Sequence, residues 1–474
     1  MSDHLTRRLL RTQRSWLSIT QVCTYWRSLI TNNPAFWTNL KLRAFFNRQL
    51  AAAFLRRAEN RLIDLRYRGS GNPPNRDPLL IASFIDSHTS RIKGLSIVQL
   101  DHEETEVMVR RLCTPALRLQ TLEISAVRRR TVLYPIFTGI LPALQDFRMT
   151  GLCTALPQSS SMRVLILESS HMMRSFGWIL ECLHEMPFLE VLHVNQLTQY
   201  PYTLPQDPTH ILPVQLARLK SFAWTSWIPK DLTAVLEYIV FPPTANVKLH
   251  FCYLSIPLTI ALHDKSVSLQ TIASRVPAAI LIVSKDPKYA TAILQSADHQ
   301  LELQWSWREG QPGAASARPF ERITFNALLF LSLRQLSVHS LRRELKETDW
   351  ANILESLYSL ETLDVGANVM TVRHLGAALS PSDHAVTSSV YLCAQLKHLK
   401  IVHLQRGERC LHELLSSLMR RSRVGLKLRS LALALPKDGE LVSHPQSILR
   451  AIADEVKVQY HTLHPQRYSW QPSS

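Results

Sequence analysis

The large apolar residues of this chain return in one arrangement, L-x-x-L-x-L, in which other apolar residues replace some of the leucines. In each of the two runs that these hexads form, neighbouring hexads lie 18 to 36 residues apart. The ten hexads are residues 92–97, 119–124, 144–149, 162–167, 189–194, 219–224, 333–338, 360–365, 396–401 and 428–433. The last two apolar residues of a hexad are separated by one residue, which places both on the same face of an extended strand. The pattern therefore predicts ten short strands with one apolar face each.

A strand with one apolar face cannot bury that face alone, so the repeats are expected to stack on one another. Repeats of about 20–29 residues, each with a strand and a helical or irregular return, are typical of leucine-rich repeats. The spacing thus predicts an α/β fold of the leucine-rich-repeat solenoid type, with a curved parallel sheet and helical returns behind it. A generic α/β protein with parallel strands is the alternative.

The segments between the hexads support strands that alternate with helices. Residues 177–184, 349–357 and 412–419 have helical periodicity, and Asp349 is placed to cap the second of them. The long interval between residues 224 and 333 has only short β-rich stretches, at 247–251, 278–284 and 301–307, which lack the full hexad.

The segment before the hexads has the pattern of a capped helix. Ser18 and Gln21 have the spacing of a capping box, and Leu17 and Val22 are placed to form the hydrophobic staple that accompanies it. Ile19, Val22, Trp26, Leu29 and Ile30 would then share one helical face. Pro34 disfavours helix at Asn33 and should end the element there.

The stretch ITQVCTYWRSLITNNPAFWTNLKL resembles the second half of an F-box, and the chain as a whole is similar to fungal F-box proteins with degenerate leucine-rich repeats. The resemblance implies an F-box core and adaptor-binding set of Ile19, Val22, Cys23, Trp26, Arg27, Leu29, Pro34, Phe36 and Trp37. It departs from the family in residues 1–17, which lack the Leu-Pro phrase that opens the first F-box helix. Either the N-terminal half of the F-box is missing, or the F-box is degenerate and binds the adaptor weakly.

The resemblance also implies a domain order and a set of partners. Residues 1–17 would be a basic segment in the place of a truncated F-box helix, 18–45 the F-box-like segment, 46–436 the solenoid, and 437–474 a C-terminal cap or tail. The F-box would bind the adaptor subunit of a cullin-RING (SCF-type) ubiquitin ligase, and the repeats would bind a target protein. The chain would then be a substrate receptor without enzymatic activity of its own.

Composition leaves two rival functions open. The formal charge is +17, and residues 1–68 hold 13 Lys and Arg against 3 Asp and Glu, a local charge of +10. Such a bias suits an acidic adaptor, but it also suits nucleic acid or an anionic membrane surface. The smaller basic cluster at 420–423 is interpreted as solvated surface. A repeat scaffold that binds protein without a ligase is the second rival.

Cysteine spacing, catalytic motifs and apolar runs add no further candidate function. The seven cysteines stand singly, which fits a reducing compartment, cytoplasm or nucleus, and indicates neither a zinc site nor a disulfide framework. The sequence contains no nucleophile elbow, P-loop or zinc-protease motif, so no catalytic, cofactor-binding or metal-ligating residue is assigned. No apolar run reaches the roughly 18 residues needed for a transmembrane helix, and nucleic acid is not the favoured partner.

Overall fold

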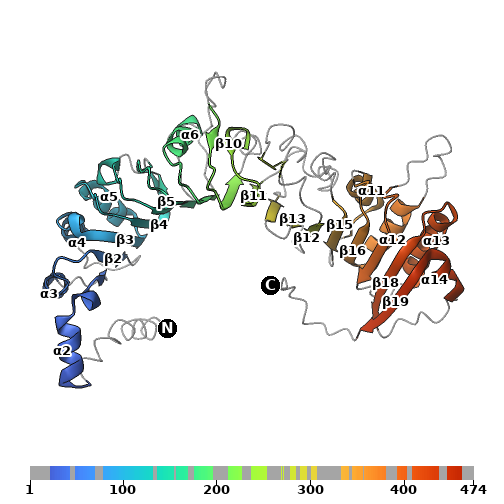
Figure 1. Ribbon diagram of the computed structural model, residues 1–474, viewed down its shortest axis with the longest axis horizontal. Helices are drawn as coiled ribbons and strands as arrows, with labels where there is room; N and C mark the ends of the chain where they lie inside the picture. Colours follow the sequence, from blue (N-terminus) through green and yellow to red (C-terminus); the bar gives the residue numbers. More distant parts are fainter. Residues whose placement is uncertain are drawn as a thin grey trace. The chain divides into compact units, whose positions relative to one another are not determined.

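A computed structural model of the chain shows a mixed α/β protein with parallel sheets and helices, as the repeat pattern predicts (Figure 1). The chain forms two compact units, Met1–Leu219 and Lys220–Ser474. The structure describes residues 22–42, 48–69, 78–131, 136–153, 156–168, 176–195, 212–226, 236–252, 268–269, 271, 278–283, 289–295, 300–306, 333–340, 344–355, 357–380, 392–402, 408–436 and 446–461.

In the first unit, strands alternate with helices and short 3₁₀ turns. Its helical elements are α2 (Thr24–Asn32), η1 (Pro34–Trp37), α3 (Arg48–Arg57), α4 (Pro78–Asp86), η2 (Thr89–Arg91), α5 (His102–Arg111), η3 (Ile136–Gly139) and α6 (Phe176–His184). Its strands are β1 (Asn39–Leu42), β2 (Ile63–Arg68), β3 (Ile92–Leu100), β4 (Thr121–Thr131), β5 (Asp146–Cys153), β6 (Val164–Glu168), β7 (Val191–Asn195) and β8 (Val214–Gln215).

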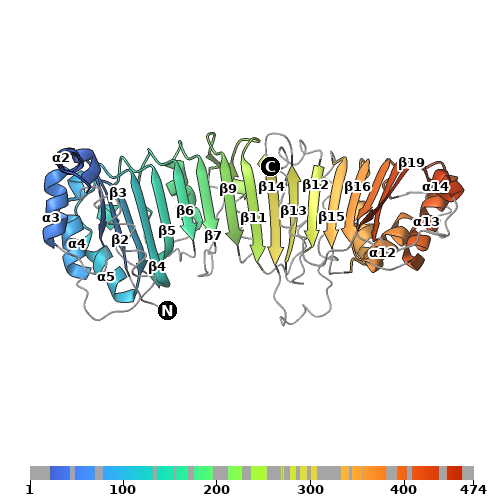
Figure 2. The same cartoon turned by 90° about the horizontal axis from the view of Figure 1, so that it is seen from below.

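Strands β1 to β7 pair in chain order, and every pair is parallel (Figure 2). The hexads lie in register: Leu95 is level with Leu122, which is followed on the next strands by Phe147, Leu165 and Leu192. The two strands before the first hexad already belong to this arrangement, because Leu40 and Leu65 continue the same row. The predicted register of the repeats is therefore seen within this unit.

Most hexads also begin with one shared backbone geometry. In these hexads the N–H of the first residue donates to the carbonyl three residues back, as from Leu144 to Leu141 (3.0 Å) and from Leu189 to Met186 (3.2 Å). In most of them the next N–H donates to the carbonyl at the equivalent place in the preceding repeat, as from Gln145 to Gln120 (2.8 Å). A tight turn thus leads into these strands and ties them to the previous ones.

In the second unit the strands are β9 (Ser221–Ser226), β10 (Ile239–Val240), β11 (Asn246–Cys252), β12 (Ala278–Val283), β13 (Tyr289–Gln295), β14 (Gln300–Ser306), β15 (Gln335–Ser340), β16 (Thr362–Ala367), β17 (His398–Val402), β18 (Leu428–Pro436) and β19 (Ala453–His461). The helices are α11 (Glu347–Glu355), α12 (Val369–Leu379), α13 (Glu408–Arg423) and α14 (Gln446–Ile452). The helices α11 to α14 lie on one side of the strands β15 to β19 (Figures 1 and 2).

The sheet of the second unit combines a regular part with an inserted one. Strands β15 to β19 pair in chain order and in parallel, and Leu336, Leu363, Leu399, Leu431 and Val456 form one row. Strand β19, from the segment expected as a cap or tail, continues this part. Between β11 and β15 the spatial order is instead β14, β13, β12, with β13 antiparallel to both neighbours. The long interval without full hexads is thus filled by three strands in reversed order.

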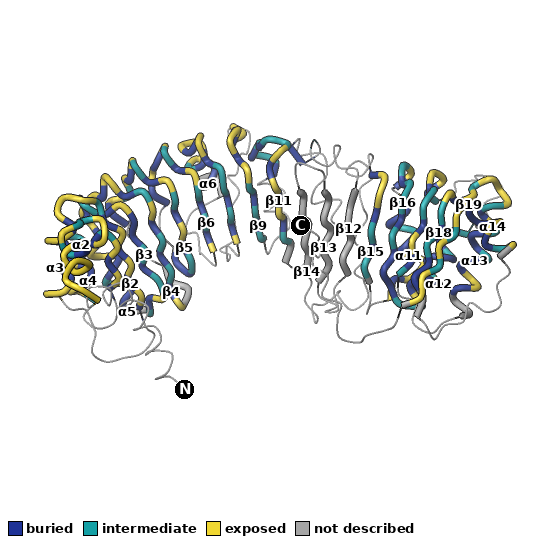
Figure 3. Tube along the Cα trace, turned by 60° about the horizontal axis from the view of Figure 1, so that its bottom comes forward, coloured by how far each residue is buried: buried dark blue, intermediate teal, exposed yellow. Residues whose placement is uncertain are grey.

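The core lies beneath the hexads of both units. All thirty apolar hexad residues are at most 3% exposed, and along strands such as β2 and β6 burial alternates from one residue to the next (Figure 3). Full burial of a leucine-sized side chain contributes about 1.5–3 kcal/mol, so these rows are the main source of cohesion. The residues between them face the opposite side of the sheet.

The predicted helices are present with small corrections. Residues 177–184, 349–357 and 412–419 correspond to α6, α11 and α13. Asp349 does not open α11, which begins at Glu347; its carboxylate instead accepts the backbone N–H of Lys346 (2.8 Å) from within the first turn. An acidic side chain that reaches back from the third helical position caps the helix end in the manner of a capping box.

Candidate functional site

The F-box-like segment contains a helix that ends where the sequence predicts and begins later than predicted. Helix α2 ends at Asn32, because Asn33 is extended (φ −105°, ψ 107°) before Pro34. Its first helical residue is Thr24, since Cys23 is also extended (φ −158°) and gives no side-chain cap. Val22, predicted to lie inside the helix as the fourth helical residue, therefore precedes it, which corrects the capping-box register. Ser18, Gln21, Leu17 and Ile19 lie outside the described residues.

Pro34 and Trp37 build the turn that follows the helix. The Asn33 side chain accepts the N–H of Ala35 (3.0 Å) and so caps η1, where Pro34 occupies the first position. Trp37 is 2% exposed, and its indole N–H donates to the carbonyl of Ile30 at 2.7 Å. This hydrogen bond fixes η1 against the last turn of α2.

Helix α3 completes the environment of Trp37. Phe54 meets the indole edge to face, with ring centroids 4.9 Å apart. The Arg57 guanidinium lies 4.3 Å from the centre of the Trp37 ring, in cation–π contact. Trp37 thus joins α2, η1 and α3, and Ile30, 3% exposed, lies in the same core.

Most of the predicted helical face is exposed. Of the described residues of that face, only Ile30 is buried. We call the exposed apolar side chains of this segment the α2 patch: Val22 (70% exposed), Tyr25 (69%), Trp26 (44%), Leu29 (38%) and Phe36 (46%). Tyr25 and Trp26 are in edge-to-face contact, with ring centroids 6.1 Å apart. Single exposed apolar residues are ordinary, but a group with two large aromatic rings and a leucine on one helix, flanked by two further apolar side chains, is typical of an interaction site.

The remaining residues of the predicted set flank this patch. Cys23 and Arg27 are exposed, and Pro34 is half-buried. The set therefore divides into an anchor, Trp37, and an accessible surface, so the structure does not bring all of its members together in one core.

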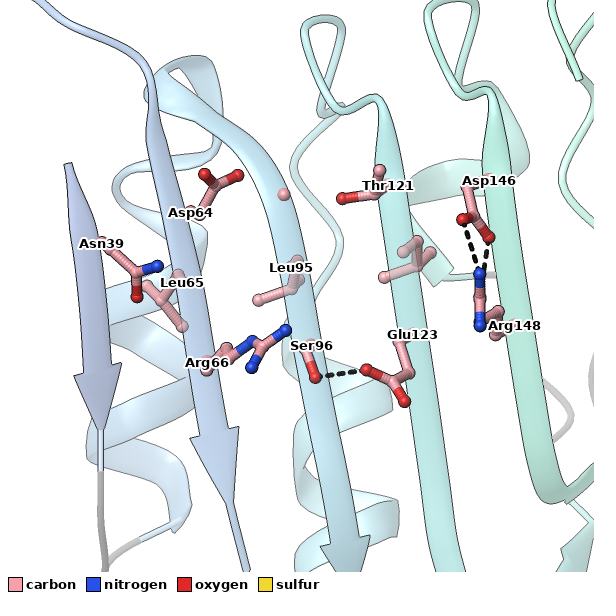
Figure 4. A pocket seen from close by; sticks show the side chains of 12 residues that line it. Asn39, Asp64, Leu65, Arg66, Leu95, Ser96, Thr121, Glu123, Asp146 and Arg148 are labelled. Atoms are coloured by element: carbon pink, nitrogen blue, oxygen red, sulfur yellow. Dashed lines mark hydrogen bonds and ion pairs between the residues drawn. The ribbon is translucent and has the colours of Figure 1, made fainter. Parts of the chain in front are cut away.

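A second candidate is a hollow on the solvent face of the first unit's sheet, with a volume of about 460 Å³; Figure 4 shows the side chains that line it. It extends over strands β1 to β5. Its polar lining residues are Asn39, Asp64, Arg66, Ser96, Thr121, Glu123, Asp146 and Arg148, with Gly94 on its floor. We call it the Gly94 hollow. Sequence reasoning missed these residues. Those on β3, β4 and β5 hold the third and fifth places of hexads, and those on β1 and β2 hold the equivalent places ahead of the first hexad. These places face away from the core.

The second unit's sheet has a charged row of its own. Burial lowers the pKa of His339, an effect that Asp364 partly opposes. Burial also raises the pKa of the Asp364 carboxyl, against the attraction of Lys400 and His339. Beside them, His398 and Ser430 are hydrogen-bonded at 2.8 Å. These side chains come from neighbouring parallel strands and form a polar surface on that unit.

Other kinds of site find no support in the described residues. No three of their His, Cys, Asp and Glu side chains are grouped so as to hold a metal ion. No described helix has the length and apolar character to cross a membrane. Cys393, although buried, is a poor nucleophile, because burial raises the pKa of its thiol to about 12.

The chain matches no protein-family model, and no curated protein matches it.

Proposed function

We propose that this protein is the substrate-receptor subunit of a cullin-RING ubiquitin ligase. In this proposal the F-box-like segment binds the adaptor subunit through the α2 patch. The two sheets are parts of a leucine-rich-repeat solenoid, and its polar faces bind the target. The observation that carries the proposal is the α2 patch itself, a set of exposed apolar side chains on a segment whose sequence resembles an F-box.

The geometry around Trp37 supports this role. A binding helix must be held rigidly if its exposed side chains are to dock without a large loss of entropy. Trp37 provides that support, because it is buried and is hydrogen-bonded to the backbone of α2. Large aromatic residues such as Trp26 and Tyr25 are the commonest energetic centres of protein interfaces.

The charge of the region supports an acidic partner. The first 68 residues carry a net charge of +10, and exposed arginines such as Arg56 lie on α3, next to η1. Complementary charge speeds the encounter and orients the partner, while apolar contacts supply most of the affinity.

The test is co-purification of the full chain with the adaptor subunit, followed by titration. We expect the double variant Trp26→Ala/Phe36→Ala to bind the adaptor at least about 30-fold more weakly, as for a 2 kcal/mol interface centre. Both side chains are exposed, so the fold should be retained. Tyr358→Ala is the matched control, because Tyr358 is an aromatic residue that is 54% exposed in the second unit.

Failure of the unaltered chain to bind the adaptor would refute the ligase proposal. The repeats would then be a scaffold that binds protein without a ligase. Equal loss of binding in Tyr358→Ala would show instead that the α2 patch is not the contact surface.

A further inference from the structure

The Gly94 hollow exists because one strand presents very small side chains to solvent. Strand β3 contributes Gly94 and Ser96 to this face, whereas its neighbours contribute longer polar chains (Figure 4). Asp64 on β2 and Thr121 on β4 lean over the glycine: a Cβ atom there would lie 2.4 Å from Asp64 Oδ1 and 2.8 Å from Thr121 Oγ1. The result is a notch along β3 with polar walls.

Some of the charges in this notch are already neutralised. Arg148 forms two parallel hydrogen bonds with Asp146, from Nε to Oδ1 and from Nη2 to Oδ2, both at 3.1 Å. That geometry is the strong bidentate form of an arginine–carboxylate pair. The pair closes one end of the hollow and offers little net charge to a ligand.

Three charged groups remain available. Ser96 Oγ donates to Glu123 Oε2 at 2.6 Å, which fixes that carboxylate and leaves Oε1 open. The Arg66 guanidinium and the Asp64 carboxylate have no side-chain hydrogen bond or ion pair to any other residue in the part of the chain that the structure describes. Arg66 and Asp64 thus face the notch from β2, and Glu123 faces it from β4.

The spacing of the strand positions that carry these groups suits an extended peptide. The backbone positions of Arg66 and Glu123 are both aligned with Ser96 on the strand between them, so these positions are two strand spacings, or about 10 Å, apart. The Arg66 side chain extends from its strand toward Ser96 (Figure 4). Residues two or three positions apart in an extended chain are separated by about 7–10 Å. The volume of about 460 Å³ is within the range of small-ligand sites, and the polar lining does not favour an apolar ligand.

We propose that the Gly94 hollow binds a short extended segment of the target protein that carries a basic and an acidic side chain two or three residues apart. The lysine or arginine lies against Asp64 and Glu123, and the acidic side chain lies against Arg66. The inference rests on the proposed function in so far as that function assigns target binding to the sheet.

The test selects peptides without the adaptor, so it is independent of the ligase. The full chain is immobilised and used to select phage-displayed random octapeptides. We expect enrichment, of about tenfold or more, of sequences with opposite charges two or three positions apart. A selected peptide, made with blocked ends, is then titrated by fluorescence anisotropy.

Variants of the hollow give the decisive readout. Glu123→Gln and Arg66→Gln should each weaken the selected peptide at least about tenfold, which corresponds to one hydrogen bond to a charged group. Arg66→Glu should recover binding when the acidic residue of the peptide is replaced by lysine. Glu455→Gln, an exposed carboxylate on β19, is the matched control and should leave the affinity unchanged.

A steric variant tests the place of binding. Gly94→Ala adds a methyl group to the floor of the hollow, where it meets only the ends of two flexible side chains. We expect the fold to be retained and the peptide to bind more weakly. Selection of peptides without the charge pair, absence of any selection, or affinities indifferent to all four variants would overturn the inference. A chain that binds the peptide and not the adaptor would retain the inference and refute the ligase.

Discussion

The guanidinium of Arg421 lies inside the second unit, although its sequence neighbours made it look like part of a solvated basic cluster. It is 1% exposed, and it donates to the carbonyl of Leu392 (2.8 Å) and to that of Cys393. Helix α13 thereby closes the turn that precedes β17. Burial lowers the pKa of Arg421, so the charge is kept at a cost in solvation. The interpretation of residues 420–423 as wholly solvated was wrong at this position.

We expect Arg421→Ala to lower the free energy of unfolding by about 2–4 kcal/mol, because two carbonyls lose their donor and a cavity remains. Arg420→Ala is the adjacent control: Arg420 is exposed, so its loss should change stability by less than about 0.5 kcal/mol. Urea unfolding followed by circular dichroism measures both. Equal stability of the two variants would show that the carbonyls of this turn find other partners.

Two tryptophans of the F-box-like segment show why single residues are hard to assign from sequence. Trp26 has helical spacing to Leu29 and Ile30 and was predicted to belong to the F-box core or to the adaptor contact, and it is 44% exposed. Trp37 follows a proline without a periodic pattern, and it is the buried anchor. Periodicity identifies an apolar face, but it does not say whether the covering surface belongs to the same chain.

At the scale of elements, helix α5 begins with a capping box, and one residue of that box also hydrogen-bonds to the sheet. Asp101 accepts the N–H of Glu104 (2.9 Å), and Glu104 accepts the N–H of Asp101 (3.1 Å). The buried Glu104 carboxylate also receives the hydroxyl of Tyr67 on β2 at 3.0 Å. The Asp-x-x-Glu spacing was present in the sequence, while the contact with Tyr67 depends on the register of β2 and β3.

We expect Glu104→Ala to destabilise the protein by about 2–3 kcal/mol, since the cap is lost and the Tyr67 hydroxyl loses its hydrogen bond to Glu104. Glu104→Gln keeps an acceptor oxygen at the same reach and should cost about 1 kcal/mol or less. Thermal and urea unfolding compare the two variants. If glutamine were as costly as alanine, the negative charge near the helix N-terminus would be the important contribution.

At the scale of the molecule, the regular part of each sheet could be predicted and the irregular part could not. The hexads indicate which residues are buried. Their last two apolar residues alternate along the strand, and the same positions recur in the next hexad, so neighbouring parallel strands bury matching residues. The strands β12 to β14 follow no such rule. Their order in the sheet runs against the order in the chain, which depends on pairings between segments far apart in sequence.

The candidate sites divide in the same way. All members of the α2 patch except Tyr25 were named from the sequence, since a motif is local, but the sequence did not separate the exposed members of the set from the buried ones. The Gly94 hollow required the strand register first: Asp64, Gly94 and Thr121 are adjacent only after β2, β3 and β4 are aligned. A site made of third and fifth hexad positions can be listed from sequence, but its unpaired charges are known only when every neighbouring side chain is placed.

The net charge of +17 gives a prediction that separates the ligase from a polyanion binder. A protein that makes six to ten phosphate contacts loses about 10³–10⁵ in affinity between roughly 50 and 200 mM salt. The α2 patch is apolar, so we expect adaptor affinity to fall by less than about tenfold over that range, because charge contributes mainly to encounter.

Titrations of the adaptor and of duplex DNA at the two salt concentrations make the comparison, with Trp26→Ala/Phe36→Ala in parallel. The affinity for DNA should fall steeply with salt and should be the same in the double variant, since the DNA phosphates would contact arginines and not the exposed aromatic rings. DNA binding that is tight at the lower salt and falls steeply at the higher one, with no adaptor binding at either concentration, would make the basic surface the functional one.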